Sequence, residues 1–265
     1  MTFLRNTEHR RIMWLKRQVA RLLCSFPVAS LVCFVTRGIV PSRGMLFDTR
    51  SSEVSDSTRA QLFWRIYESA EVRLVRDHLR DTRCLVDLGC SLGVLASVAA
   101  SRMSPRSRLV CVEANPDLIE LARRNIRRNA PHVRAKVIHG ALDYSQDTAS
   151  QVSFERGKNH TASALTEDGH PTDGFWAPAL QLNELLASER IEEFSLLADI
   201  EGAEAGLLSM DGASLRNCRQ IVIELHDATF AGRSVSQDDL LQQALALGFE
   251  VSASYGSVYV LQRVN

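Results

Sequence analysis

The stretch Cys84-Leu-Val-Asp-Leu-Gly-Cys-Ser-Leu-Gly93 decides the fold of this 265-residue chain. Its first five residues are mostly apolar and predict a buried strand, and Gly89 and Gly93 predict a tight turn. Residues 92–103 then have the apolar content and the length of a helix. A strand, a glycine turn and a helix in this order are typical of a parallel α/β sheet.

Short apolar strands and helices continue to alternate after this stretch. We expect strands at residues 84–89, 108–113, 133–139, 194–200 and 220–226, helices at 92–103, 116–129, from about 203 and at 236–247, and a closing hairpin at 249–253 and 257–262. Near-continuous apolar strands between helices indicate a parallel sheet covered on both faces. The closing antiparallel hairpin is typical of class I methyltransferases, so we predict an α/β fold with a doubly wound, mostly parallel seven-stranded sheet.

The chain before this core predicts a helical N-terminal extension. We place that extension at residues 1–82 and the sheet domain at residues 83–265, with a polar insertion at about 145–178. Residues 41–58 are rich in turn-forming residues and are interpreted as a connector, followed by one helix to about residue 81.

The amino end combines basic and apolar segments. Residues 1–21 hold six cations and one acid, and residues 22–35 carry no charge. This apolar run is shorter than the roughly 20 residues that span a bilayer, and Pro27 interrupts it. We favour a packed or substrate-covering pair of helices, with peripheral membrane contact through residues 5–35 as the alternative and a signal peptide or a membrane span as the least supported interpretation.

Composition excludes several classes of protein. With 45% hydrophobic residues and 31 cations against 31 acids, the chain is neither disordered nor a typical nucleic-acid binder. The six cysteines form no C-x-x-C pair, which fits a reducing cytoplasm, with the inner face of the membrane as the alternative location. We therefore expect a small-molecule or glycan acceptor as the partner, and no nucleic acid.

Polar residues gather where the predicted strands end. These residues are Asp87, Gly89 and Gly93 after the first strand, Glu113 after the second, Gly140 and Asp143 after the third, Asp199 and Glu201 after the fourth, and Glu224, His226 and Asp227 after the fifth. Ligands of parallel sheets bind outside the carboxyl ends of the strands, so this edge is the predicted site.

The first turn favours S-adenosylmethionine as the cofactor. Its pattern D-x-G-x-x-x-G differs from the dinucleotide pattern G-x-G-x-x-G, and Asp87 would repel a pyrophosphate but attract an amino group. Glu113 stands where an acid can accept both ribose hydroxyls. The expected cofactor contacts are Asp87, Gly89, Cys90, Gly93, Glu113, Ala114, Gly140, Ala141 and Leu142.

The segment Asp199-Ile-Glu-Gly-Ala-Glu204 resembles a signature of the FkbM family of S-adenosylmethionine-dependent methyltransferases. Residues 86–89, 112–116 and 223–226 also match the family, whereas Leu197 stands where the family has a lysine. The resemblance covers about residues 60–230. It implies O-methylation of a sugar or of a natural-product hydroxyl.

A hydroxyl acceptor needs a general base, and we choose Asp199, with Glu201 and His226 as alternatives. The neighbouring acids could also hold a divalent metal through hard oxygens, but a metal is not favoured. Glu204 is explained equally well as a charge in the first turn of a helix. Candidate acceptor-binding residues are Arg156, Lys158, Asn159, His160 and Glu224.

Two other functions compete with O-methyl transfer. One is an NAD-dependent oxidoreductase, which the missing G-x-G-x-x-G pattern disfavours. The other is a protein that keeps the S-adenosylmethionine-binding fold but binds without catalysis.

Overall fold

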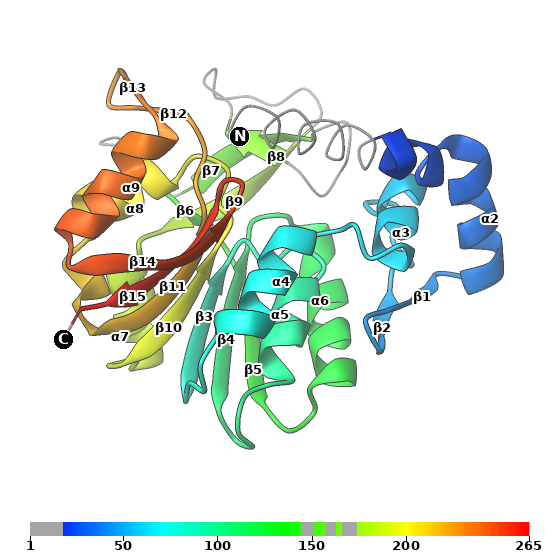
Figure 1. Cartoon of the computed structure of the whole chain (residues 1–265), viewed down its shortest axis with the longest axis horizontal. Coiled ribbons are helices and arrows are strands. Elements are labelled where there is room, and N and C mark those ends of the chain that lie inside the picture. Colours follow the sequence, from blue (N-terminus) through cyan, green and yellow to red (C-terminus); the bar gives the residue numbers. More distant parts are fainter. Residues whose placement is uncertain (1–17, 145–150, 157–162, 166–173, 265) are drawn as a thin grey trace, which may run out of the picture. The chain divides into compact units, whose positions relative to one another are not determined.

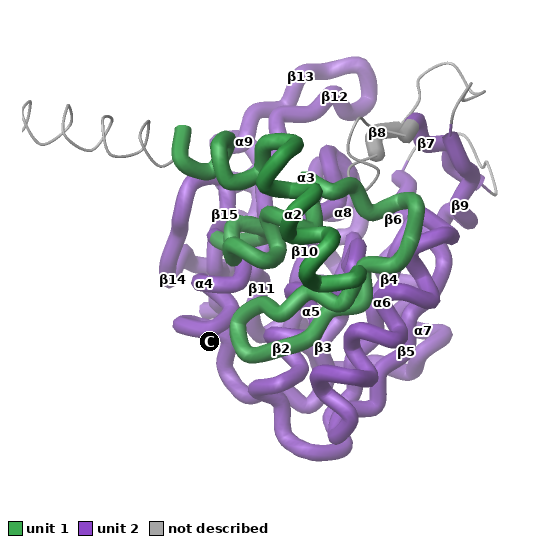
Figure 2. Tube along the Cα trace, turned by 90° about the vertical axis from the view of Figure 1, so that its right-hand side faces the viewer, with its two compact units in different colours: residues 1–69 green, residues 70–265 purple. Residues whose placement is uncertain are grey.

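The computed structural model describes residues 18–144, 151–156, 163–165 and 174–264. Contacts divide the chain into two compact units, Met1–Ser69 and Ala70–Asn265 (Figure 2). This division lies earlier than the boundary that we expected at residues 82 and 83. The residues from Ala70 onward fall in the second unit, and their end is bonded there to Gln220. The Gln220 side chain donates to the carbonyl of His78 (2.9 Å) and accepts from the amide of Arg80 (3.2 Å).

The first unit contains a hairpin as well as helices. Residues 18–23 are helical, and they are followed by α2 (Phe26–Thr36), β1 (Ile39–Ser42), β2 (Met45–Asp48) and α3 (Asp56–Phe63). Strands β1 and β2 pair antiparallel around Arg43 and Gly44, which both have the positive φ angles of a two-residue hairpin turn. The interpretation of residues 41–58 as a connector was therefore wrong, because the turn residues that indicated a loop instead join two strands.

The single helix expected up to residue 81 is also two helices. Helix α3 ends at Phe63 and α4 (Ser69–His78) begins after a break in which Arg65 and Glu68 have left-handed backbones. Neither residue is a glycine, so the sequence carried no signal for this break. Among the described residues, no helix has the length and apolar content needed to cross a membrane.

The second unit confirms the predicted fold class. Seven described strands form its main sheet, namely β3 (Cys84–Leu88), β4 (Arg108–Glu113), β5 (Arg134–His139), β10 (Phe194–Ala198), β11 (Cys218–Glu224), β14 (Phe249–Tyr255) and β15 (Val258–Arg263). Their order is β14-β15-β11-β10-β3-β4-β5, and only the pairs that involve β15 are antiparallel (Figure 1). This mostly parallel sheet with a closing hairpin is the class I methyltransferase arrangement.

Helices cover the sheet. They are α4, α5 (Val94–Ala100), α6 (Pro116–Asn129), α7 (Leu182–Glu189), α8 (Glu204–Met210) and α9 (Gln237–Ala246), with a short 3-10 helix at Ser214–Asn217. Figure 1 shows α4, α5 and α6 together beside β3, β4 and β5. Leucines of α7, α8 and α9 share a hydrophobic core with β10 and β11. Helix α6 begins as the sequence predicted, with the Asn115 side chain accepting from the amide of Asp117 (3.0 Å).

The polar insertion contains strands of its own. The strands β6 (Ala141–Leu142), β7 (Gln151–Arg156), β8 (Ser163–Leu165) and β9 (Gly174–Leu180) form a second sheet in the order β6-β9-β7-β8. Strand β7 pairs antiparallel with both β8 and β9. A further small hairpin, β12 (Ala228–Phe230) with β13 (Arg233–Val235), follows β11.

The ends of β3 and β10 approach each other closely at Gly89. The amide of Asp199 donates to the carbonyl of Leu88 (3.1 Å), which continues the pairing of the two strands. A Cβ added at Gly89 would lie 2.0 Å from the carbonyl oxygen of Asp199, and the φ angle of Gly89 is +84°. Only glycine fits at this position, because both the backbone angle and the space exclude a side chain.

We therefore predict that Gly89→Ala lowers the free energy of unfolding by more than about 2 kcal/mol, since the strain of a left-handed backbone adds to a clash with Asp199. Gly232→Ala is the matched control, because Gly232 has a similar φ angle of +73° but nothing within 4 Å of an added Cβ. The control should lose only about 1 kcal/mol. Equal losses in urea unfolding would show that the close approach does not matter.

Candidate functional site

The turn after β3 is closed by main-chain bonds. Gly93 has a φ angle of +72°, caps the start of α5 and donates from its amide to the carbonyl of Cys90 (2.7 Å). The thiol of Cys90 is buried against Cys111, and both the bond to Cys111 and burial raise its pKa. Cys90 was predicted to contact the cofactor, but its side chain lies in the protein interior, so only its backbone faces the turn.

Glu113 holds this turn to the end of β4. Its carboxylate accepts from the amide of Ser91 (2.7 Å) and from the amide of Asn115 (2.8 Å), and the residue is buried. Burial raises the pKa of Glu113, and these amide bonds oppose the rise. A carboxylate oxygen can accept two hydrogen bonds, and each oxygen of Glu113 accepts one of these two amide bonds. Both oxygens therefore keep a lone pair for a ribose hydroxyl.

Asp87 is the most deeply buried acid of the predicted cofactor site. It is 2% exposed, and its Oδ2 atom finds no hydrogen-bond partner among the described residues. Burial, and secondly the charges of Glu113 and Asp199, raise the pKa of Asp87 from 3.8 to about 8. A buried oxygen without a partner costs free energy, so this carboxyl is suited to a ligand that donates a hydrogen bond or brings a positive charge.

The remaining predicted cofactor residues are placed less directly. The carbonyl of Ala114 lies 3.0 Å from Nε2 of His139, and a Cβ on Gly140 would lie 2.3 Å from the Leu180 side chain. Ala141 and Leu142 are buried, and Leu142 belongs to the hydrophobic core. The side chain of Leu142 therefore packs inside the protein, and only its backbone could meet a base.

A second cluster lies where β10 and β11 end, and Glu204 organises it. Glu204 is fully buried at the start of α8, accepts from the amide of Gly202 (2.8 Å) and lies 2.9 Å from Nδ1 of His226. The bond to Glu204 raises the pKa of His226 to about 9. His226 therefore carries a positive charge at neutral pH, and its other nitrogen, Nε2, lies 3.7 Å from Glu201 and 3.9 Å from Glu224.

Asp199 completes this cluster. The carboxyl is half-buried, and its Oδ1 atom has no hydrogen-bond partner in the described part of the chain. Burial first, then the charges of Glu224 and Glu201, raise the pKa of Asp199 to about 7, whereas His226 opposes the rise. An acid with this pKa exchanges a proton readily near neutral pH.

Sequence reasoning missed several residues that shape the two clusters. Glu71 on α4 adds to the negative charge around Asp199, and Ser257 donates to Glu224 (2.7 Å). Ser91 supplies the amide that fixes Glu113. Nothing in the local sequence marks Glu71 or Ser257, because each lies far along the chain from its partner.

Donor atoms of Asp199, Glu224 and His226 lie within 4.8 Å of one another, a spacing that would suit a divalent cation. Glu204 occupies Nδ1 of His226, so Nε2 is the nitrogen that a cation would bind after it loses its proton. The expectation that a metal is not favoured stays a prediction.

Most of the acceptor-binding residues that we predicted on the insertion lie outside the residues that the structure describes. Lys158, Asn159 and His160 lie outside the described residues, and Arg156 is placed only as the last backbone position of β7. Glu224, which was predicted with them, lies in the His226 cluster.

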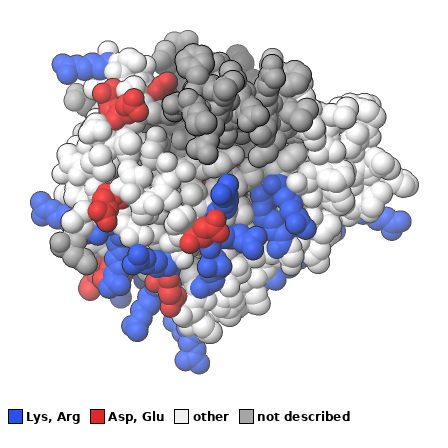
Figure 3. Space-filling model, viewed as in Figure 1, with Lys and Arg blue, Asp and Glu red and all other residues white. Residues whose placement is uncertain are grey.

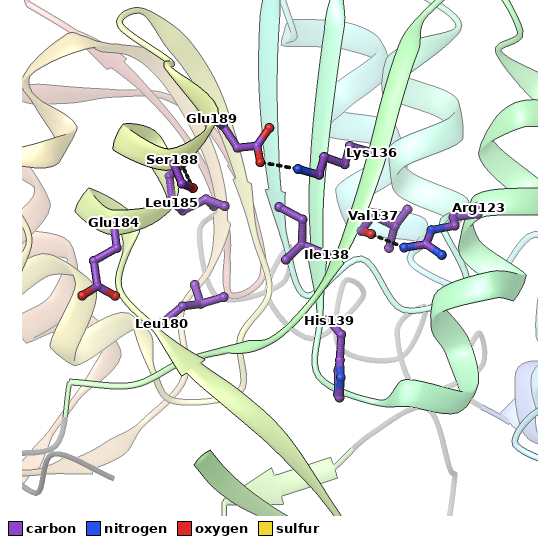
Figure 4. Close-up of a pocket in the computed structure, with 10 residues that line it drawn as sticks. All are labelled: Arg123, Lys136, Val137, Ile138, His139, Leu180, Glu184, Leu185, Ser188 and Glu189. Carbon is purple, nitrogen blue, oxygen red and sulfur yellow. Dashed lines mark hydrogen bonds and ion pairs between the residues drawn. The ribbon is translucent and has the colours of Figure 1, made fainter. Parts of the chain in front are cut away.

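A groove of about 460 Å³ lies elsewhere, between β5 and α7 (Figure 4). Across it Lys136 forms an ion pair with Glu189 (2.5 Å), while Arg123 donates to the carbonyl of Val137 (2.7 Å). Figure 4 draws the Lys136–Glu189 ion pair and the Arg123–Val137 hydrogen bond as dashed lines. The groove contains none of the predicted cofactor or catalytic residues.

Comparisons with known proteins agree with this fold. A family model described as the methyltransferase small domain matches residues 70–153. Ribosomal RNA large subunit methyltransferase G of Aliivibrio salmonicida is 37% identical over 100 residues, which cover 36% of this chain and 26% of that protein. The antimetabolite synthetase AmbE of Pseudomonas aeruginosa is 27% identical over 205 residues, which cover 63% of this chain and 10% of that protein.

This chain thus spans no more than 26% of the length of either relative. A methyltransferase structure from Geobacter sulfurreducens aligns with 91% of this chain and 90% of its own, at 14% identity and a TM-score of 0.42. The matches relate the chain to class I, S-adenosylmethionine-dependent methyltransferases. They do not single out the FkbM family, so that finer resemblance stays a prediction.

The raised pKa of Asp87 predicts a pH dependence of stability. The pKa of Asp87 rises from 3.8 to about 8 on folding. The contribution of this carboxyl to the free energy of unfolding is therefore fully present below pH 3.8 and is lost as the pH rises through 8. Asp87→Asn removes this titration. As the pH rises from about 5 to about 9, the free energy of unfolding of the wild type should therefore fall relative to that of the variant by more than about 1 kcal/mol.

The control for this experiment is Asp238→Asn, which changes an exposed acid of α9. Urea unfolding of the three ligand-free proteins at several pH values gives the comparison. Parallel pH profiles for wild type and Asp87→Asn would contradict the assignment.

A second prediction concerns Glu204. Glu204→Gln removes the charge next to Nδ1, so the pKa of His226 should fall from about 9 toward its usual value of 6.5. Imidazole resonances followed by NMR from acid to alkaline pH measure this shift. Glu201→Gln, at the longer distance of 3.7 Å, should lower the pKa less, and the opposite ranking would refute the role of Glu204.

Proposed function

We propose that this chain transfers a methyl group from S-adenosylmethionine to a hydroxyl group of a sugar, glycan or natural-product acceptor. One observation carries the proposal. The neighbouring strands β3 and β10 end in two acids, Asp87 and Asp199, that each keep a buried oxygen without a hydrogen-bond partner in the described structure. Two such oxygens at adjacent strand ends are suited to two ligands, a cofactor and an acceptor.

The residues around Asp87 fit the cofactor. Below about pH 8 the Asp87 carboxyl of the free protein holds a proton, and a positively charged amino group beside it would favour loss of that proton. Glu113 keeps lone pairs for ribose hydroxyls, and the backbone at Gly89 and Gly93 allows close approach. When bound, S-adenosylmethionine supplies a methyl group on a sulfonium, which is a good leaving group. The match of residues 70–153 to a methyltransferase family model supports the same cofactor.

The residues around Asp199 fit the acceptor. Asp199, with a pKa of about 7, would take the proton from the acceptor hydroxyl as the bond from the hydroxyl oxygen to the methyl carbon forms. The bond from that carbon to the sulfonium sulfur would break in the same step, and S-adenosylhomocysteine would leave. His226 is protonated and serves as a nearby positive charge that holds Asp199 and Glu224 together, rather than as the base. Glu204 fixes the His226 ring through Nδ1 and leaves Nε2 toward the cluster.

The charge of the cluster also bears on the class of acceptor. Some relatives of this chain are named as ribosomal RNA methyltransferases. Here, however, Asp199, Glu201 and Glu224 gather around His226, and Glu71 adds negative charge near Asp199. A concentration of acids repels phosphates, so an uncharged polyhydroxylated acceptor is favoured over RNA.

We predict that Asp199→Asn lowers the rate of methyl transfer about 100-fold or more, in the range that general bases contribute, and leaves cofactor affinity unchanged. The assay follows S-adenosylhomocysteine formation with a panel of sugar nucleotides, lipid-linked glycans and polyhydroxylated natural products, with RNA as a further member. Calorimetry with S-adenosylhomocysteine checks the affinity. An active Asp199→Asn would exclude the base.

The competing functions have separate outcomes. Binding of NAD but not of S-adenosylhomocysteine would favour an oxidoreductase. Binding of S-adenosylhomocysteine without turnover on any member of the panel would favour a non-catalytic binding protein. Asp87→Asn should weaken cofactor binding in calorimetry, whereas the surface variant Asp238→Asn should not.

A further inference from the structure

Helix α2 presents large apolar side chains to solvent. Phe26 and Phe34 are each 81% exposed, Leu31 is 61% exposed and Val35 is 66% exposed. Six of the thirteen exposed large apolar residues in the described chain lie between residues 19 and 35. An exposed apolar surface of this kind marks an interaction site, because soluble proteins rarely leave such side chains together in water.

The exposed residues occupy one side of the helix. At about 100° per residue, Phe26, Phe34, Leu31 and Val35 fall within one half of the helical circumference. The buried residues Ala29 and Val32 fall in the other half, where α2 packs within its own unit. Helix α2 is therefore anchored by one side and offers the other side to a partner.

The charges around this face indicate the partner. No charged residue lies between positions 22 and 36, and Arg21 and Arg37 flank this segment. Residues 1–47 contain eight cations and a single acid, Glu8, although the whole chain is neutral. In Figure 3 the surface at the α2 end of the first unit is largely white, with blue at its margin.

We propose that α2 binds an anionic lipid surface, with its apolar side in the headgroup region and the neighbouring arginines at the phosphates. Apolar side chains flanked by cations are the features that hold a helix in the plane of a membrane. A second copy of the chain is disfavoured as the occupant, because two strongly basic segments would then face each other. The proposal is independent of methyl transfer.

The test is co-flotation of the full chain with vesicles of phosphatidylcholine, with and without phosphatidylglycerol. We expect binding to the anionic vesicles only, weakened when NaCl rises from about 0.1 M to about 1 M and the screening length falls from about 10 Å to about 3 Å. The double variant Phe26→Gln/Phe34→Gln should lose about tenfold or more of the bound fraction per unit lipid.

The matched control is Met210→Gln/Val251→Gln, which removes two exposed apolar residues of the second unit and should bind like the wild type. Thermal unfolding checks that both variants fold, which is expected because all four side chains are exposed. Absence of binding to anionic vesicles overturns the proposal. A second result would also overturn it: the wild type is a dimer in light scattering and does not bind vesicles, and the Phe26→Gln/Phe34→Gln variant is a monomer.

Discussion

The contact between the backbone of Gly89 and the carbonyl of Asp199 is the constraint on which the site depends. It allows β3 and β10 to end side by side, with the amide of Asp199 donating to the carbonyl of Leu88 and no room for a side chain at Gly89. Any larger residue at Gly89 would push the two strand ends apart. Asp87 and Asp199 lie at neighbouring ends because the main chains, rather than side chains, set this distance.

The same closeness explains the electrostatics. Burial raises the pKa of both carboxyls. The charges of Glu113 and Asp199 add to the rise at Asp87, and those of Glu224 and Glu201 add to the rise at Asp199. The protein tolerates this charge through fixed donors. Backbone amides neutralise part of Glu113, and His226 sits within the second group of acids. Perturbed acids gathered in this way are typical of a functional site rather than of a folding core.

The sequence predicted correctly those helices and strands that are marked by residues within the element or directly beside it. Helix α6 and strand β4 have the predicted bounds, because Asn115 and Pro116 mark the start of the helix and residues 109–112 of the strand are all apolar. The break between α3 and α4 was not predictable in this way. Arg65 and Glu68 adopt backbone angles that glycine usually provides, so the chain turns where helical spacing appeared to continue.

The sequence by itself determined the α/β sheet, the glycine turn and the placing of an acid at the end of several strands, because each depends on residues close together in the chain. The tertiary structure alone decided the role of each acid. Glu204 became the partner of a histidine 22 residues away, and Ser257 bound Glu224. Asp87 and Asp199 each keep one oxygen that has no partner among the residues that the structure describes. Burial and hydrogen-bond partners come from segments that only folding brings together, and these set the charge of each group.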